Sequence, residues 1–533
     1  FNKGALPDSG VLPVYPLTEG LSQKTVRKAE SAALKQCALG IDNELPDEII
    51  VKRELLQKKD ALRLIHMPAQ YSDVEKARHT LIYEELYHFQ YTMAERAFAH
   101  KGSLPPSEIV PLENETNRAQ NPVEKAAFTG SLSPRQKQLL ERLPFLLTDD
   151  QICVIMQMDS DIDRGYKDRS ALLKEKAESV HNRPVYTMAR LLQGDVGSGK
   201  TLAAFFACLR AADWGGQCAI MAPTEILARQ HAENAARLLE PIGIRIAFLT
   251  GKLQASGRAQ LLKALKNGDI DIVIGTHALF SNGVIYKDLQ LVVIDEQHRF
   301  GVTQRNAIIG KGLQLSSGRF VSPHLLMMSA TPIPQTLALT AFGDLDISAI
   351  KTMPSGRKPV TTYLVCEGHE QNAYEAVRKE LKKGYQAYFV YPAIEGAETE
   401  ESSDSADGDN TRTSLKAAEE MFQVLSSKVF PEYLCALLHS KVDEDTQIKV
   451  LNEFRDGKIQ VLVATTVVEV GVDVPNATCM VIEMADRFGL SQLHQLRGRV
   501  GRGSAQSYCF LIYGKNITQN GIARMKALRE STD

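Results

Sequence analysis

Gly194-Asp195-Val196-Gly197-Ser198-Gly199-Lys200-Thr201 is the stretch that decides the fold. It fits the phosphate-binding pattern G-x-x-x-x-G-K-[ST]. The apolar run 188–192 before it predicts a buried strand, and residues 201–207 after it predict a helix. Glycines let backbone N–H groups face phosphate oxygens, and a helix N-terminus adds partial positive charge. We therefore expect Lys200 to reach the β- and γ-phosphates of a nucleotide and the Thr201 hydroxyl to hold Mg²⁺.

Downstream of this loop, short apolar runs alternate with amphipathic segments, and each run ends in polar residues. The runs and their endings are 218–222 before Pro223-Thr224-Glu225, 246–249 before Thr250-Gly251, 272–274 before Gly275-Thr276-His277, 291–294 before Asp295-Glu296-Gln297-His298, and 325–328 before Ser329-Ala330-Thr331. Strands that are apolar throughout predict a parallel sheet covered by helices on both faces. Open α/β sheets carry their sites at the carboxyl ends of the strands, which is where these polar residues fall.

A second set of the same design begins near Val360, without a second phosphate loop. Its runs are 387–390, 436–438 before His439-Ser440, 461–464 before Thr465-Thr466, and 480–483. The acidic, Ser/Gly-rich stretch 395–410 between the first two runs predicts a disordered loop. The expected fold class is therefore α/β, with two tandem parallel-sheet lobes.

The residues before the phosphate loop predict a different organisation. The run 11–15 looks like the closing strand of a domain further upstream, and residues 22–100 read as helical. The clearest helix starts at Ser72 with a capping box to Glu75, and Gly102 is its expected stop. Its apolar stripe predicts core packing or docking on a neighbour. The stripe consists of Ile82, Leu86, Phe89 and Met93.

Residues 103–123 then predict a linker, and a short helix starts at Ser133. Gln151 could pair with both the donor and the acceptor edge of adenine, and Phe145 could pack beside the base. Residues 159–184 are highly charged and predict a surface insertion, with a helix over 170–179.

Composition sets limits on the class of protein. A length of 533 residues predicts three or four domains, and a formal net charge of −2 means that any DNA binding must use local basic patches. The eight cysteines show no CxxC pair and no zinc spacing, so they predict buried thiols in a reducing cytosol. No apolar run is long enough to span a membrane. Because the chain begins at Phe1, we expect a fragment of a longer protein.

Two further groups complete the expected chemistry. Asp295, after an apolar strand, is placed to bind Mg²⁺, and Glu296 to act as general base on the attacking water. Phosphoryl transfer also needs positive charge on the γ-phosphate, for which the candidates lie in QLRGRVGR at 495–502. An arginine there could reach across a cleft between the lobes, so that the site is complete only when the lobes close.

The ordered series GDVGSGKT, APTE, TG, GTH, DEQH, SAT, ATTVVEVGVDVP and QLRGRVGR resembles the superfamily 2 helicase motif set. More specific blocks closely resemble the RecG family of bacterial fork-remodelling helicases, over about residues 12–529. These blocks are PVYPLTEGLSQKTVRKA, DEQHRFGVTQR, ATPIPQTLALTAFGDLD and RFGLSQLHQLRGRVGRG.

The resemblance implies roles by position. Phe145 and Gln151 would recognise adenine. Gly194 to Thr201 and Asp295-Glu296 would be the two Walker motifs. Gly471 and Asp473 would lie in the ATP-side loop of the second lobe, and Arg499 and Arg502 would be the arginine fingers. Ser329 and Thr331 belong to the segment that couples hydrolysis to DNA movement. Contacts to the DNA backbone fall on Thr224, Thr250, Gly251 and Thr276 in the first lobe and on His439, Ser440 and Thr465 in the second.

The resemblance also implies a domain plan and shows departures from it. Residues 1–18 would be a remnant of an N-terminal wedge with an oligonucleotide-binding fold, 19–125 a helical linker region, 126–355 the ATP-binding RecA-like lobe, and 356–533 the second RecA-like lobe. Most of the wedge and a C-terminal hook are expected to be missing. Gln335 stands where an arginine is expected, and Ser329 where threonine is common.

The implied function is an ATP- and Mg²⁺-dependent cytoplasmic DNA helicase that regresses stalled forks and migrates branched junctions. Branched DNA would be its partner, single-stranded-DNA-binding protein a further one, and a monomer its state. One alternative is a transcription-repair coupling factor, whose motor is similar. The helical region before the motor and GRKPV at 356–360 favour the RecG family. A second alternative is a nucleotide-dependent clamp on branched DNA without processive turnover.

Overall fold

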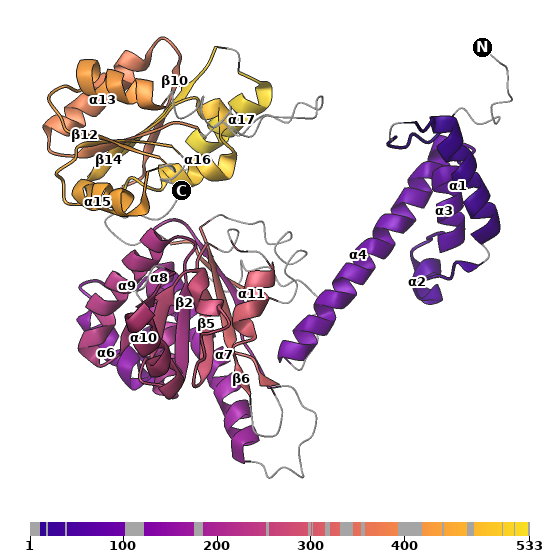
Figure 1. The fold of residues 1–533 in the computed structure, drawn as a ribbon, viewed down its shortest axis with the longest axis horizontal. Helices are drawn as coiled ribbons and strands as arrows, with labels where there is room; N and C mark the ends of the chain where they lie inside the picture. Colours follow the sequence, from indigo (N-terminus) through magenta and orange to yellow (C-terminus); the bar gives the residue numbers. More distant parts are fainter. Residues whose placement is uncertain are drawn as a thin grey trace. The chain divides into compact units, whose positions relative to one another are not determined.

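The chain forms two compact units, a helical unit within residues 1–99 and a unit that contains both sheets. Figure 1 shows the course of the chain. The computed structural model describes residues 11–17, 20–37, 40–101, 122–174, 185–251, 255–296, 300, 302–314, 320–330, 345–352, 358–392, 418–439, 442–465, 474–503, 505–515 and 517–530.

The helical unit packs three short helices beside one long helix. Its helices are α1 (Gln23–Cys37), α2 (Asp47–Lys52), α3 (Lys58–His66) and α4 (Tyr71–Lys101). Leu45, Ile50 and Leu55 form a small buried cluster, and Tyr83 and Tyr87 of α4 pack against it. The sequence correctly predicts this region to be helical.

Two details of α4 differ from the sequence prediction. The helix begins at Tyr71, and the Asp73 carboxylate accepts the backbone N–H groups of Ala69 and Gln70 at 3.1 Å each, ahead of the predicted start. The predicted stripe is buried only at Met93, because the buried positions of α4 include Thr80 and Glu84, which bond to the neighbouring segment. Ile82, Leu86 and Phe89 are exposed. The predicted stop at Gly102 lies outside the described residues.

The strand predicted at 11–15 is not formed in the described residues 11–17. An extended segment without a neighbouring strand must satisfy its backbone groups elsewhere. Here the Gln23 side chain bonds both backbone groups of Tyr15, at 3.1 and 2.6 Å, and Arg27 Nε donates to the Pro13 carbonyl at 2.8 Å. Side chains of α1 thus bond the backbone of this segment, for which the sequence predicts the closing strand of an upstream domain.

The first sheet is parallel and, in the described residues, has seven strands in the order β3-β4-β2-β5-β8-β1-β9. The strands are β1 (Ala189–Gly194), β2 (Gln217–Met221), β3 (Ile246–Leu249), β4 (Ile272–Gly275), β5 (Leu289–Ile294), β8 (His324–Ser329) and β9 (Asp346–Ile350). A separate antiparallel pair joins β6 (Leu313–Gln314) to β7 (Phe320–Val321). The parallel sheet confirms the predicted fold class for this lobe.

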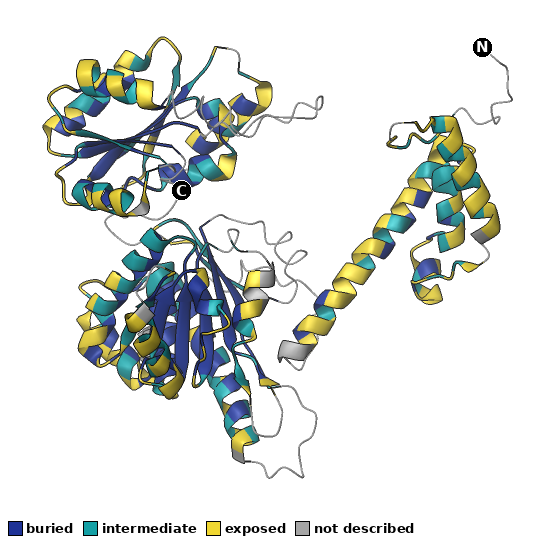
Figure 2. Cartoon of the chain, in the orientation of Figure 1, coloured by how far each residue is buried: buried dark blue, intermediate teal, exposed yellow. Residues whose placement is uncertain are grey.

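Helices cover the first sheet and bury its apolar strands, which Figure 2 shows in dark blue. These helices are α5 (Pro122–Ser131), α6 (Pro134–Arg142), α7 (Asp149–Lys174), α8 (Lys200–Asp213), α9 (Glu225–Leu239), α10 (Ala255–Asn267) and α11 (Val302–Ile309), with the short turns η3 (Glu240–Ile242) and η4 (His277–Phe280). Ile220, Ile274 and Val293 point from the sheet into one cluster with α6, α7 and α8. The predicted helix start at Ser133 is confirmed, since its N–H donates to Gln136 Oε1 at 2.9 Å.

The predicted surface insertion at 159–184 is wrong for the part that the structure describes. Residues 159–174 continue α7, and their charges pair with the body of the lobe. Arg210 of α8 binds Asp163, and Arg190 of β1 binds Asp161 at 2.7 Å. A run of charges therefore marks a helix face buried by ion pairing, which composition alone cannot distinguish from a solvated face. The helix predicted over 170–179 ends at Lys174, and residues 175–184 lie outside the described residues.

The second sheet is also parallel and, in the described residues, has six strands in the order β10-β15-β14-β11-β13-β12. The strands are β10 (Thr361–Cys366), β11 (Gln386–Val390), β12 (Cys435–Leu438), β13 (Val461–Ala464), β14 (Ala477–Ile482) and β15 (Tyr508–Tyr513). Its helices are α13 (Glu370–Lys382), α15 (Glu444–Arg455), α16 (Leu490–Arg497) and α17 (Gln519–Glu530), with η6 (Leu425–Val429) and η8 (Ala485–Arg487).

Both faces of the second sheet are buried, as the sequence predicts for a parallel sheet. Phe389 and Val463 lie in the cluster that includes α13 residues, and Tyr388 and Leu462 in the cluster that includes residues of α15, α16 and α17. The predicted disordered loop at 395–410 lies outside the described residues.

Two predictions from composition can be compared with the structure. The cysteines whose side chains are described are free thiols, as expected, but Cys153, Cys366 and Cys435 are only partly buried. Within the described part of the chain, no helix is long and apolar enough to cross a membrane.

Candidate nucleotide and DNA sites

The phosphate-binding loop connects β1 to α8, as its sequence predicts. Gly197 and Gly199 have φ values of 82° and 93°, a left-handed conformation that glycine adopts without strain. A Cβ on Gly199 would also collide with the amide of Gln151. The loop thus has the turn and the open backbone that a phosphate group needs.

Lys200 is the first residue of α8, and its side chain turns back onto the loop. Its Nζ donates to the carbonyl oxygens of Gly194 and Asp195, at 2.6 and 2.8 Å. Burial lowers the pKa of Lys200, while the negative charges of Asp295, Glu296 and Asp195 act in the opposite direction. A phosphate group entering the loop would offer this ammonium stronger acceptors than the two carbonyls.

Asp295 and Glu296 follow β5, which lies next to β8 and β2 in the sheet. Asp295 Oδ1 accepts the N–H of Glu296 at 3.0 Å, and Oδ2 lies 2.7 Å from Nε2 of His231. Burial raises the pKa of Asp295, but the His231 hydrogen bond and the charges of His231 and Lys200 outweigh it and hold this pKa below its usual value. Asp295 is therefore an ionised, buried carboxylate.

Glu296 has a φ of 50°, the left-handed region that costs an L-residue roughly 1–2 kcal/mol. Such strain is found at functional sites, where the surrounding structure holds a side chain in one direction. In this chain the strain falls on the residue that the sequence predicts to be the general base.

Arg499 and Arg502 follow α16 of the second lobe. Arg499 is buried, and burial together with the charge of Arg502 lowers its pKa to about 10, so it stays charged at neutral pH. Arg502 is partly buried, and its Nε donates to the Gly498 carbonyl oxygen at 3.3 Å. Two guanidinium groups thus stand close together at the predicted finger positions.

One cavity of about 640 Å³ brings the predicted catalytic residues of both lobes together. Its lining includes Phe145, Gly197, Gly199, Lys200, Thr201, Asp295, Glu296, Arg499 and Arg502. Phe145 is half exposed at this cavity. Gln151 is buried beside the loop instead, where its Nε2 donates to the Ser198 carbonyl at 2.8 Å.

The predicted DNA-contacting residues of the first lobe stand at the carboxyl ends of three neighbouring strands, β2, β4 and β3. Thr224 caps α9 through a hydrogen bond to the Leu227 N–H at 3.3 Å. Thr250 and Thr276 are buried after β3 and β4, and Gly251 is exposed. Because all the strands are parallel, these residues share one sheet edge with the phosphate loop and Asp295, which follow β1 and β5. The β3-β4-β2 half of this edge carries the DNA candidates and the β5-β8-β1 half the nucleotide candidates.

The second lobe repeats this arrangement. His439 and Thr465 follow β12 and β13, which are neighbours in the sheet, and Thr465 N–H donates to the Leu438 carbonyl at 3.2 Å. Ser329, in the first lobe, is buried at the end of β8. Several predicted residues lie outside the described residues and are not placed here: Thr331, Gln335, Ser440, Gly471 and Asp473.

Sequence reasoning missed some residues of the cavity. His231, Asn234 and Arg237 of α9 line it, although they follow the phosphate loop by thirty residues or more. The available signal was the position of His231 among the buried residues of α9 between Ala228 and Ala235, where a polar side chain needs a partner.

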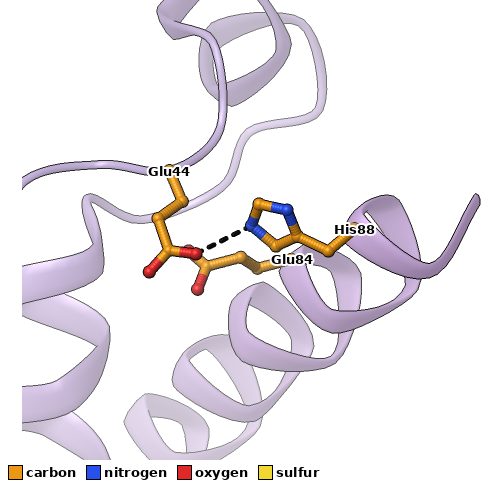
Figure 3. A group of neighbouring side chains, drawn as sticks. All are labelled: Glu44, Glu84 and His88. Carbon is orange, nitrogen blue, oxygen red and sulfur yellow. Dashed lines mark ion pairs between the residues drawn. The ribbon is translucent and has the colours of Figure 1, made fainter. Parts of the chain in front are cut away.

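The helical unit holds a group of side chains that resembles a metal site, shown in Figure 3. Glu44, Glu84 and His88 have ligand atoms within 4.8 Å of one another. The ammonium of Lys58, however, binds Glu44 and lies 2.8 Å from Glu84 Oε1. The two carboxylates already have a cation between them, so this group is explained as an ion-pair network.

Known proteins resemble the chain at the level of both domains and the whole sequence. Residues 176–340 match the family model of the DEAD/DEAH box helicases, and residues 409–504 match that of the helicase conserved C-terminal domain. The chain is 49% identical over 523 residues to the ATP-dependent DNA helicase RecG of Treponema pallidum and 40% identical over 523 residues to that of Borreliella burgdorferi. These alignments cover 98% of this chain and 70% and 67% of the two relatives.

Among solved structures, RecG bound to a three-way DNA junction matches with a TM-score of 0.66 and 37% identity. The match covers 98% of this chain and 61% of that chain, so this sequence spans less than two thirds of the protein in that structure. The sequence blocks, the two parallel sheets and these matches agree. The chain belongs to the RecG family of ATP-dependent DNA helicases.

Proposed function

We propose that the two lobes form a motor that uses ATP hydrolysis to remodel branched DNA, by regressing stalled replication forks and migrating four-way junctions. The main support for this proposal is one cavity that is lined by residues of both lobes. Lys200, Asp295 and Glu296 belong to the first lobe, and Arg499 and Arg502 belong to the second. A site assembled from two lobes can be completed or broken by their movement, which is what a motor requires. The solved RecG relative bound to a three-way junction supports branched DNA as the substrate.

The residues of the cavity fit a nucleotide with Mg²⁺. The loop turns in a left-handed conformation at Gly197 and Gly199, and its backbone, with Gly194 and Ser198, would cradle the phosphates. The Thr201 hydroxyl and the ionised Asp295 are oxygen ligands of the kind that Mg²⁺ prefers. Phe145, at the rim, is placed to pack beside the base. A bound Mg²⁺ would neutralise charge on the phosphates.

The proposed hydrolysis assigns one task to each remaining side chain. Lys200 leaves its two loop carbonyls to bind the β- and γ-phosphates, Glu296 accepts a proton from the attacking water, and Arg499 and Arg502 stabilise charge on the transferring group. Because the arginines belong to the second lobe, hydrolysis depends on the distance between the lobes. Gly471 and Asp473 are proposed for the same side of the nucleotide from the family resemblance alone.

The DNA candidates follow the same logic. Hydroxyl groups and backbone N–H groups at strand ends contact phosphates and sugars, which carry no sequence information. Thr224, Thr250, Gly251 and Thr276 would hold the DNA backbone from the first lobe. His439, Ser440 and Thr465 would hold it from the second, with Ser329 and Thr331 in the segment that connects the two sites. This division suits a motor that must move along any sequence.

The test is ATP hydrolysis by this chain with forked duplex, linear duplex, single-stranded DNA and RNA, each compared with no nucleic acid. We expect the largest stimulation with the fork and none in Lys200→Ala. If the chain gives no stimulation, the same assay on a chain extended to the full length of its relatives decides. Stimulation restored there assigns the loss to the absent parts, and continued absence rejects the proposal.

A transcription-repair coupling factor is the nearest alternative, since its motor is similar. The helical unit before the motor favours the RecG assignment, and a pull-down that retains RNA polymerase would favour the alternative. Absence of turnover with the extended chain, together with tight fork binding, would favour a nucleotide-dependent clamp. We also propose that the protein is a cytoplasmic monomer that contacts single-stranded-DNA-binding protein. Its domain boundaries are proposed to lie at residues 18, 125 and 355.

A further inference from the structure

His231 stands in a position that the nucleotide site does not explain by itself. It lies two turns into α9, and its Nε2 is 2.7 Å from Oδ2 of Asp295. Both side chains are buried, with 5% of His231 and 8% of Asp295 exposed. Hydrogen bonds to an ionised carboxylate are stronger than those between neutral groups, and burial strengthens them further.

The two oxygens of the Asp295 carboxylate have different hydrogen-bond partners. Oδ1 accepts the Glu296 N–H at 3.0 Å, and Oδ2 receives His231. With one donor on each oxygen, the carboxylate plane cannot turn about the Cβ–Cγ bond without breaking a bond. Removal of His231 would leave a buried oxygen without this donor and only the Glu296 N–H to hold the carboxylate.

His231 lies on the buried face of α9, where an imidazole needs a hydrogen-bond partner. The buried residues of α9 on either side of His231 are Leu227, Ala228, Ala235 and Leu239, so the histidine occupies an otherwise apolar face. An imidazole buried among apolar groups is unfavourable unless it is hydrogen-bonded. Asp295 supplies that partner, across 64 residues of sequence.

We propose that His231 is a positioning residue that holds the Asp295 carboxylate in the orientation in which it binds Mg²⁺. The inference rests on the proposed function, because it takes Asp295 as the metal-binding carboxylate. Partners behind a metal-binding carboxylate fix its orientation, and their loss commonly weakens metal binding by about 10- to 100-fold. Since Thr224 caps α9, the same helix also joins the proposed DNA edge to the metal-binding carboxylate.

The experiment measures nucleotide binding, not turnover. Binding of a fluorescent ADP is titrated with Mg²⁺ and with EDTA, and the ratio of the two affinities gives the contribution of the metal. We expect this ratio to fall by about 10-fold or more in His231→Phe, which fills the space without a donor, while the affinity in EDTA is unchanged. His231→Gln, which keeps a nitrogen donor near the same place, should retain most of the ratio. Arg229→Gln, at a surface ion pair on the same helix, is the control for disturbance of α9.

Each outcome has a defined meaning. An unchanged ratio in His231→Phe rejects the inference, as does an equal loss in EDTA, which would show general disruption of the site. A His231→Gln variant that folds normally but is not rescued also rejects it. Asp295→Asn separates the two levels of the argument: if it keeps the full ratio, the proposed metal role of Asp295 falls. If the affinity ratio decreases in Asp295→Asn but not in His231→Phe, only the proposed role of His231 is rejected.

Discussion

Gln151 donates a hydrogen bond from Nε2 to the carbonyl oxygen of Ser198 at 2.8 Å, and its Oε1 accepts the N–H of Thr148 at 2.9 Å. The side chain is buried, so it joins the first turn of α7 to the phosphate-binding loop. The sequence predicted contact with adenine for this residue. Its position supports the loop directly, and any contact with the base must use the second amide hydrogen or the second oxygen lone pair.

The Gln151→Ala variant separates these two roles. Loss of the bond to Ser198 should weaken the binding of ADP and of GDP alike, by about 5- to 10-fold, since one hydrogen bond contributes about 1 kcal/mol. Loss of a base contact should in addition reduce the preference for ADP over GDP. Both affinities can be measured by titration with fluorescent diphosphates. If GDP binding were unchanged, Gln151 would have no part in ordering the loop.

Arg502→Ala should lower kcat by about 10²-fold or more while nucleotide affinity changes little, because a finger acts mainly on charge that develops in the transition state. Arg502→Lys should not restore the rate, since a single ammonium cannot replace the planar fork of a guanidinium. Single-turnover hydrolysis and ADP titration on the same preparations measure the two quantities. A loss of affinity as large as the loss of rate would contradict the finger role.

The sequence predicts those features of the fold and the site that depend on neighbouring residues in the chain. The parallel sheets and the sheet edge that carries the site follow from apolar runs that end in polar residues, and the loop from its glycines. The pairing of Asp161 with Arg190 and of Asp163 with Arg210 could not be read from the sequence, because ion pairs between distant segments leave no local pattern. The contact of His231 with Asp295 was missed for the same reason.

The helical unit shows the limit of periodicity. Helical spacing correctly predicted α4, but the stripe chosen as its core face is largely exposed. The face toward the unit's interior is fixed by Thr80, which accepts the Leu56 N–H at 3.0 Å, and by Glu84, which binds Lys58. Polar residues that become buried by bonding are invisible to a hydrophobic pattern.

Lys58 should determine whether Glu44, Glu84 and His88 can bind a metal ion. In the wild type we expect Zn²⁺ to leave the unfolding temperature unchanged, because the ammonium lies against both carboxylates. Lys58→Ala removes that cation, and Zn²⁺ should then raise the unfolding temperature of the variant. Thermal unfolding with Zn²⁺ and with EDTA checks both statements, and His88→Ala in the Lys58→Ala background is the control. Stabilisation of the wild type by Zn²⁺ would show that the ion-pair explanation is wrong.

Gly165 on α7 should tolerate no side chain. A Cβ there would lie 2.7 Å from Nε2 of His324 and 2.9 Å from the Tyr186 carbonyl oxygen. Gly165→Ala should lower the free energy of unfolding of the first lobe by about 1–3 kcal/mol, the usual cost of overpacking. Urea unfolding followed by the fluorescence of Trp214, the one tryptophan of the chain, measures this, since its ring stacks on Tyr166 at 4.5 Å. Gly130→Ala, which meets no atom within 4 Å, is the matched control and should not destabilise.

Glu483 should make the stability of the second lobe depend on pH. It is buried at the end of β14, and its Oε1 accepts a hydrogen bond from the Tyr374 hydroxyl at 3.1 Å. Burial raises the pKa of Glu483 to about 7, partly opposed by the Tyr374 bond. An unfolded glutamate titrates near 4.3, so between these values the folded state binds a proton that the unfolded state has lost. The stabilising effect is complete below the unfolded pKa and is lost as pH rises through about 7.

The Glu483→Gln variant tests this sign. Glutamine is neutral at every pH and can still accept the Tyr374 hydroxyl, so the variant should lose the part of the pH dependence that Glu483 causes. Between pH 5 and 8 we expect the wild type to lose up to about 3 kcal/mol more unfolding free energy than the variant, at about 1.4 kcal/mol per pKa unit. Urea unfolding followed by circular dichroism at both pH values gives the change in unfolding free energy for each protein. Subtracting the change in the variant from that in the wild type cancels the effect of the other titrating groups. Equal pH dependence in the two proteins would show that Glu483 does not retain a proton on folding.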